Sequence, residues 1–159
     1  MKKMLIFLTG ILLLSSGSSL AQSYYQRDHG LYLEIMGTGG ELSLNYEKII
    51  DNRISVRVGG GFTGLAFRKG FAIPFSVSTL LGSNQNFLEM GIGGSYLGID
   101  EDSTDDTYLD ILENQVVGNA ILGYRYLGDY GFTFRLAFTP AYTKDGFQPM
   151  GGAMFGKTW

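Results

Sequence analysis

Residues 41–58 read ELSLNYEKIIDNRISVRV, and this stretch decides the fold class. On both sides of the turn pair Asp51-Asn52, apolar residues alternate with polar ones. The apolar positions are Leu42, Leu44, Tyr46, Ile54, Val56 and Val58. Period-two alternation around an Asp-Asn turn is typical of a β-hairpin with one apolar and one polar face. The pattern leaves open whether the apolar face meets a protein core or lipid.

Similar alternation recurs along the chain and predicts an all-β fold of eight antiparallel strands. Glycine is abundant, at 24 of 159 residues, and clusters of Gly, Asn and Asp separate the alternating segments. We expect strands at residues 31–37, 41–49, 53–62, 71–81, 87–97, 115–127, 132–142 and 147–159. Most are near the roughly 9–11 residues of a tilted transmembrane strand, whereas strands in soluble proteins average about 5–6.

The two faces of these strands differ in side-chain size and charge. The apolar face comprises Leu33, Ile35, Leu42, Leu44, Val56, Val58, Ile73, Phe75, Val77, Leu88, Met90, Ile92, Leu122, Tyr124, Phe132, Phe134, Leu136, Phe138 and Phe155. The opposite face is rich in glycine and serine, which fit the narrow interior of an eight-stranded barrel, whereas the large aromatic set does not. It also carries fewer charges than the about 25–35% of a soluble exterior. We therefore predict an up-and-down transmembrane barrel whose apolar face meets lipid.

Aromatic residues are expected to form belts at both membrane interfaces. With both termini in the periplasm, one belt comprises Tyr46, Phe87, Tyr124, Tyr126, Phe132 and Trp159. The belt at the external edge comprises Phe62, Phe71, Tyr96, Tyr142 and Phe147. The short turns at 50–52, 82–86 and 128–131 are then periplasmic, and the longer loops at 63–70 and 98–114 are external.

The first residues are typical of a secretory signal peptide. Lys2 and Lys3 precede the apolar run MLIFLTGILLL, and Ser19-Leu20-Ala21 is a small-x-small cleavage site. We expect residues 1–21 to be removed and residues 22–159 to form one barrel domain. The chain has no cysteine, and its formal net charge of −3 argues against a nucleic-acid partner.

Six charged residues share the polar face and are expected to line the barrel interior. They are Glu34, Glu47, Glu89, Arg57, Arg125 and Arg135. One interpretation is an ion pathway. Because buried charges must be paired and eight strands leave little lumen, we favour a plug of ion pairs.

The segment GIDEDSTDDTYLDILEN is strongly acidic and is the first place to look for a partner. Its candidate contact residues are Asp100, Glu101, Asp102, Asp105, Asp106 and Tyr108. Clustered carboxylates suit Ca²⁺, but the EF-hand pattern fails because Asp105 replaces glycine at position six and Ile111 replaces glutamate at position twelve. A solvated surface loop is the favoured interpretation, with docking of a partner protein as the alternative.

No catalytic, cofactor or metal site is expected. The single histidine, His29, precedes the first expected strand, and we interpret it as a solvated residue on the periplasmic side. The glycine-rich run Gly91 to Gly94 is not a dinucleotide fingerprint, because no helix follows it to receive a phosphate.

In pattern, length and carboxyl-terminal residues, the chain resembles the small eight-stranded outer-membrane barrels of Gram-negative bacteria, in the style of Bacteroidota-type genomes. Phe155 and the final Trp159 are similar to the signal that the barrel-assembly machinery reads in that family, although Lys157 departs from it. The resemblance implies location in the cell outer membrane, with lipid, the assembly machinery and other outer-membrane proteins as partners. It implies no single activity.

We expect a non-enzymatic surface or structural protein, or an accessory subunit of a larger outer-membrane assembly. The main alternative is a lipid-modifying barrel enzyme, which would have to work without a histidine near the outer leaflet. A narrow channel and a soluble lipocalin-like binder remain weaker alternatives.

Overall fold

The computed structural model describes residues 27–63, 70–99, 115–143 and 146–159. In this part of the chain, no helix is long and apolar enough to cross a membrane. The strands are β1 (His29–Ile35), β2 (Leu42–Ile50), β3 (Ile54–Thr63), β4 (Gly70–Ser83), β5 (Asn86–Ile99), β6 (Gln115–Leu127), β7 (Phe132–Phe138), β8 (Ala141–Thr143), β9 (Gly146–Gln148) and β10 (Gly151–Thr158). The expected signal peptide (1–21) and the acidic residues of the candidate partner loop lie outside the described residues.

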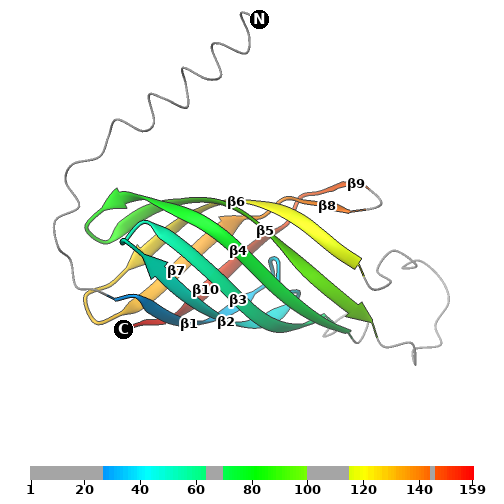
Figure 1. Cartoon of the computed structure of the whole chain (residues 1–159), viewed down its shortest axis with the longest axis horizontal. Coiled ribbons are helices and arrows are strands. Elements are labelled where there is room, and N and C mark those ends of the chain that lie inside the picture. The colour runs from blue at the N-terminus through cyan, green and yellow to red at the C-terminus, as the bar shows by residue number, and fades with distance from the viewer. Residues whose placement is uncertain (1–26, 64–69, 100–114, 144–145) are drawn as a thin grey trace, which may run out of the picture.

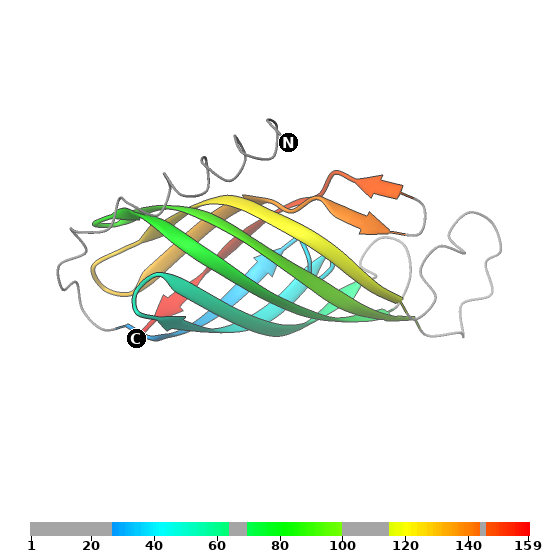
Figure 2. The same cartoon turned by 45° about the horizontal axis from the view of Figure 1, so that its top comes forward.

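The strands form a closed antiparallel barrel (Figures 1 and 2). Neighbours follow the order β5-β4-β3-β2-β1-β10-β7-β6, and pairing of β5 with β6 closes the ring. The prediction of an all-β antiparallel barrel is therefore confirmed. The three short turns and the carboxyl terminus lie at one end, on the left of Figure 1, and we call it the turn end; the other is the loop end.

The ten segments make eight wall strands. β6 pairs with β7 and with β8 in one continuous register, so these two segments are parts of one strand. β9 and β10 likewise pair with β8 and β7 in one register. The interruptions fall at Pro140 and Pro149, and proline cannot donate a ladder hydrogen bond. Thr139 N still donates to Met150 O at 2.8 Å, which ties the two strands together across the break.

The opening hairpin forms as expected. β2 and β3 pair from Leu42 opposite Phe62 to Ile50 opposite Ile54. Asp51 and Asn52 adopt φ angles of 50° and 55°, a left-handed conformation that Asp and Asn tolerate better than most residues. The turn residues and the alternation in the two flanking strands therefore predicted the same hairpin that the structure shows.

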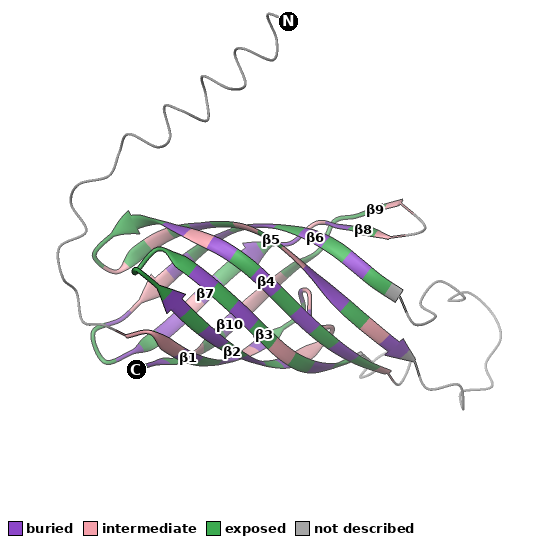
Figure 3. Ribbon diagram, viewed as in Figure 1, coloured by how far each residue is buried: buried purple, intermediate pink, exposed green. Residues whose placement is uncertain are grey.

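Burial alternates residue by residue along the strands (Figure 3). Leu44, Val77 and Leu136 are each at least half exposed, while Asn45 and Arg135 are completely buried. This confirms that the apolar face points outward and the polar face lines the lumen. The barrel is thus inverted relative to a soluble protein, which buries its apolar side chains.

Candidate functional site in the barrel lumen

Arg125 is the centre of the lumen. Its Nη1 and Nη2 donate to the two carboxylate oxygens of Glu47 at 2.7 and 2.8 Å, and its Nε donates to Glu89 Oε2 at 3.0 Å. All three side chains are fully buried. β6 and β2 lie on opposite sides of the ring, so the Arg125–Glu47 pair crosses the lumen. Bidentate pairing of a guanidinium with a carboxylate is geometrically specific and strong.

Hydroxyl groups complete the coordination of Glu47 and pack against Arg125. Tyr32 Oη donates to Glu47 Oε2 at 2.7 Å, and Ser55 Oγ donates to Glu47 Oε1. The Arg125 guanidinium lies 6.0 Å from the centroid of the Tyr32 ring, at the outer limit of a cation–π contact. Glu47, on β2, therefore has partners from β1, β3 and β6.

A second ion-pair layer joins Arg135 to Glu34 and Glu89. Arg135 Nη1 donates to Glu34 Oε1 at 3.1 Å, and its Nε lies 3.0 Å from Glu89 Oε2 without hydrogen-bond alignment. Glu89 thus bridges both arginines, and its other oxygen accepts from Ser78 Oγ at 2.9 Å. The two layers link β1, β2, β5, β6 and β7 across the lumen.

Arg57 is the exception among the six charged residues. It is only 3% exposed, yet within the described part of the chain it forms no ion pair. Its Nη1 contacts Met154 Sδ at 3.2 Å, and its Nη2 has no partner. Glu47 lies directly opposite Arg57 in the β2–β3 ladder but is held by Arg125 instead. The expectation that every lumen charge is paired is therefore wrong for Arg57.

The turn between β1 and β2 folds into the loop-end mouth of the barrel. Gly37 and Gly39 are buried, and Thr38 O accepts from Ser95 Oγ on β5, the opposite wall. Gly39 O occupies the space that a side chain at Gly61 would need. A glycine at position 61 thus permits the turn to sit inside the lumen, and the lumen is obstructed by this turn and by the ion pairs.

We predict that the protein forms no wide pore, because long side chains and the 36–40 turn fill an interior that eight strands make narrow. Proteoliposomes should not swell in isotonic small-sugar solutions, and planar bilayers should show no large, stable conductance. Vesicles with a 16-stranded porin provide the positive control. Stable sugar permeation would make transport the leading function.

His29 is a packed residue at the turn end and does not precede the first strand. It is the first residue of β1, its Nδ1 lies 2.5 Å from Tyr46 Oη, and its ring stacks on Trp159 with centroids 6.4 Å apart. Backbone hydrogen bonds join His29 and Trp159 in both directions. The expectation that His29 precedes the first strand is therefore wrong, although the residue is partly exposed at the turn end. This contact closes the seam between the first and last strands.

The proposed carboxyl-terminal signal residues lie along this seam. Phe155 points outward from β10 and pairs in register with Leu33 on one side and Phe134 on the other. Trp159 follows β10 and is 55% exposed. Both aromatic side chains are thus presented on the outer surface near the first strand.

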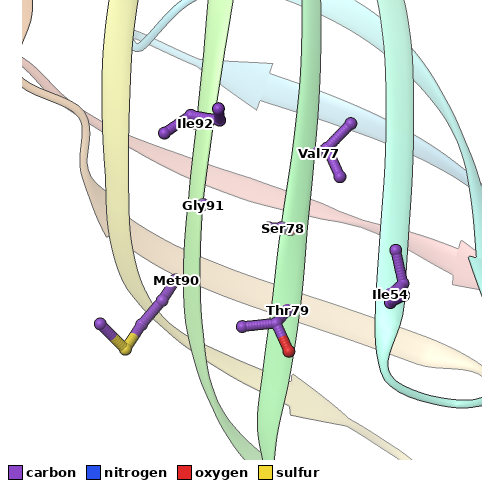
Figure 4. A pocket seen from close by; sticks show the side chains of 7 residues that line it. All are labelled: Ile54, Val77, Ser78, Thr79, Met90, Gly91 and Ile92. Atoms are coloured by element: carbon purple, nitrogen blue, oxygen red, sulfur yellow. The ribbon is translucent and has the colours of Figure 1, made fainter. Parts of the chain in front are cut away.

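A shallow apolar hollow lies on the outer wall across β3, β4 and β5 (Figure 4). Thr79 is opposite Ile54 in one ladder and Met90 in the other, and it is smaller than both. Val77 and Ile92 line the hollow above it. The hollow forms because Thr79 is a short side chain in a row of long ones. Its lining is mainly apolar, so it offers no catalytic group beyond a threonine hydroxyl.

Among the described residues, no group of three or more His, Asp or Glu side chains is arranged to hold a metal ion. The candidate partner loop, with its calcium and docking interpretations, lies outside these residues and stays a prediction. No protein-family model, curated protein or solved structure matches the chain. The resemblance to small outer-membrane barrels therefore also stays a prediction.

Proposed function

We propose that the chain is an integral barrel of the cell outer membrane with a non-enzymatic role, as a surface or structural protein or as an accessory subunit of a larger outer-membrane assembly. The observation that carries the proposal is the inverted barrel. Its outer wall is predominantly apolar, with Lys48 and Lys157 exposed near the turn end, and six charged side chains are buried in the lumen. Water penalises such an exterior, whereas the hydrocarbon of a bilayer accommodates it.

The backbone supports the same proposal. A structure that spans a bilayer must satisfy its hydrogen bonds internally, and a closed barrel leaves no free sheet edge around its ring. Here each wall strand pairs with a neighbour on both sides, through the closing β5–β6 ladder. The ring therefore presents no free strand edge to lipid, although the β3–β4 ladder is interrupted where Gly59 and Gly60 lie opposite Pro74 and Ile73.

Aromatic side chains gather toward both ends of the wall. At the turn end, Tyr46, Phe132 and Trp159 are exposed. At the loop end, Phe62 and Phe71 pair in register, and the Phe71 and Tyr96 rings lie 6.0 Å apart. Belts of aromatic residues on either side of an apolar band fit the two interfaces of a membrane.

The non-enzymatic assignment rests on the chemistry of the polar groups. A nucleophilic mechanism needs a nucleophile beside a base that can accept its proton. The single histidine is engaged with Tyr46 and Trp159 at the turn end, and the buried carboxylates Glu47 and Glu89 are held by Arg125. These contacts support a stabilising role for the ionisable groups. Mass spectrometry of lipid A from a deletion strain distinguishes the lipid-modifying alternative, which requires an altered acylation pattern.

Expression in a Gram-negative host tests location and topology together. We expect the protein to stay in the membrane pellet after an alkaline carbonate wash. A Ser103→Cys variant should react with a membrane-impermeant maleimide on intact cells, because the acidic loop is expected outside. The matched Ser83→Cys variant, in a turn at the other end of the barrel, should react only after lysis.

Both variants start from a chain without cysteine, so the label reports one position each. Release by carbonate would contradict the membrane assignment. Labelling of Ser83→Cys but not Ser103→Cys on intact cells would mean that the barrel is inserted the other way round.

A further inference from the structure

Arg57 is a buried cation that forms no ion pair with any described residue. In the part of the chain that the structure describes, four ion pairs join Arg125 and Arg135 to the carboxylates of Glu34, Glu47 and Glu89, and none includes Arg57. Among the described residues, the one acceptor for its guanidinium is the thioether sulfur of Met154, and sulfur is a weak acceptor. Its Nη2 has no partner although the side chain is buried. A buried charge in this condition destabilises the fold unless something else binds it.

Arg135 offers a second unsatisfied donor in the same region. Its Nη2 also has no partner, and the residue is completely buried. Met154, which contacts Arg57, is the direct cross-strand neighbour of Arg135 in the β7–β10 ladder. The side chains of Arg57 and Arg135 therefore both lie next to Met154 in the lumen.

We propose that the lumen binds one small monovalent anion, of the size and charge of chloride, between the guanidinium groups of Arg57 and Arg135. A water molecule could accept a hydrogen bond from one Nη2, but it would leave the repulsion between the two cations in place. An anion accepts from both donors and offsets that repulsion, and charge-assisted hydrogen bonds are roughly twice as strong as neutral ones.

The surrounding wall is suited to a small ligand and not to a large one. Ser76 is the cross-strand neighbour of Arg57, and Gly93 is the next residue in that row on β5. The serine side chain is short and the glycine has none, and the 36–40 turn obstructs the loop-end mouth of the barrel, so a sugar or a peptide carboxylate would not fit. The site depends only on the closed barrel and its lumen, and holds whether the outer wall meets lipid or detergent.

Chloride dependence of unfolding tests the proposal in solution. Thermal unfolding and urea unfolding are each measured in sodium chloride and in sodium gluconate of equal ionic strength, gluconate being too large for the site. Chloride should raise the thermal midpoint by roughly 5 °C in a saturating manner, because a ligand that binds only the folded state stabilises it. The urea midpoint should rise in parallel.

Arg57→Met should abolish the difference between chloride and gluconate while the barrel still folds, because it removes the unpaired charge and keeps an apolar side chain next to Met154. Lys48→Met is the matched control: it removes one positive charge from an exposed position on β2 and should keep the full chloride effect. An equal chloride effect in Arg57→Met would overturn the proposal.

A crystal of the unmodified protein soaked in bromide provides a second test. It needs no substitution, so misfolding of a variant cannot affect the result. We expect an anomalous peak within hydrogen-bonding distance of Nη2 of both arginines. Electron density for water alone at this position would contradict the proposed anion site. The absence of any chloride effect on the unmodified protein would contradict it as well.

Discussion

Replacing Arg125 by methionine is expected to lower the free energy of unfolding by about 3–5 kcal/mol, the usual cost of removing one partner of a buried ion pair. Two carboxylates lose their main counter-charge at once. Glu47 keeps only the hydroxyl groups of Tyr32 and Ser55, and Glu89 keeps Ser78 and the poorly aligned Nε of Arg135. Methionine preserves much of the volume of the arginine side chain, so the loss of stability reflects the missing charge and hydrogen bonds. Urea titration of the barrel folded in lipid or detergent measures the change.

The double variant Arg125→Met with Glu47→Gln separates charge imbalance from lost packing. Because the glutamine is neutral, the double variant should be more stable than Arg125→Met alone. Lys48→Met, on the exposed face of β2, should change stability little. If Arg125→Met matched the unmodified protein in urea, the ion-pair network would not stabilise the barrel.

Replacing Val77 by arginine is expected to destabilise the barrel by about 2–4 kcal/mol in a lipid bilayer, the range for a cation on the lipid face at the bilayer midplane. Val77 is half exposed on the outer wall, between Val56 and Ile92 in the two ladders. In a barrel surrounded by water, the same exposed substitution would change stability by roughly 0.5 kcal/mol or less. The sign and size of the change in the free energy of unfolding therefore show whether the outer wall is surrounded by lipid or by water.

The measurement is a urea titration after folding into phospholipid vesicles. Tyr130→Arg is the matched control, because Tyr130 is 92% exposed in the turn between β6 and β7, where an added charge stays in water. It should leave the unfolding midpoint nearly unchanged. Equal, small effects at both positions would mean that the apolar wall is not embedded in lipid, and the proposed location would fail.

The wall of the barrel was predictable because its signal is local. Alternation in the 41–58 stretch depends on the two-residue period of a strand and on turn residues that tolerate left-handed backbone, and both can be read from neighbouring residues. The inward direction of Arg125 and Glu47 follows from the same alternation. Only strand ends were shifted, as where β4 continues to Ser83, and prolines 140 and 149 interrupted two strands.

The missed features depend on contacts between distant segments. The 36–40 turn reads as an ordinary short connection, and its place inside the lumen depends on Ser95 and Gly61. The only signals were its three glycines and the glycine-rich β3. His29 similarly acquires its packing from Trp159, at the far end of the chain.

By itself, the sequence determined that the chain forms antiparallel strands, that one face is apolar and that six charged residues share the other. The tertiary structure alone decided which of those charges meet. Neighbours in a ladder would pair Glu47 with Arg57, but closure of the ring brings Arg125 across the lumen to take both oxygens of Glu47. Arg57 is then left without a carboxylate. The direction of a side chain is set by its own strand, whereas its partner is set by where all eight strands place their long side chains in one narrow space.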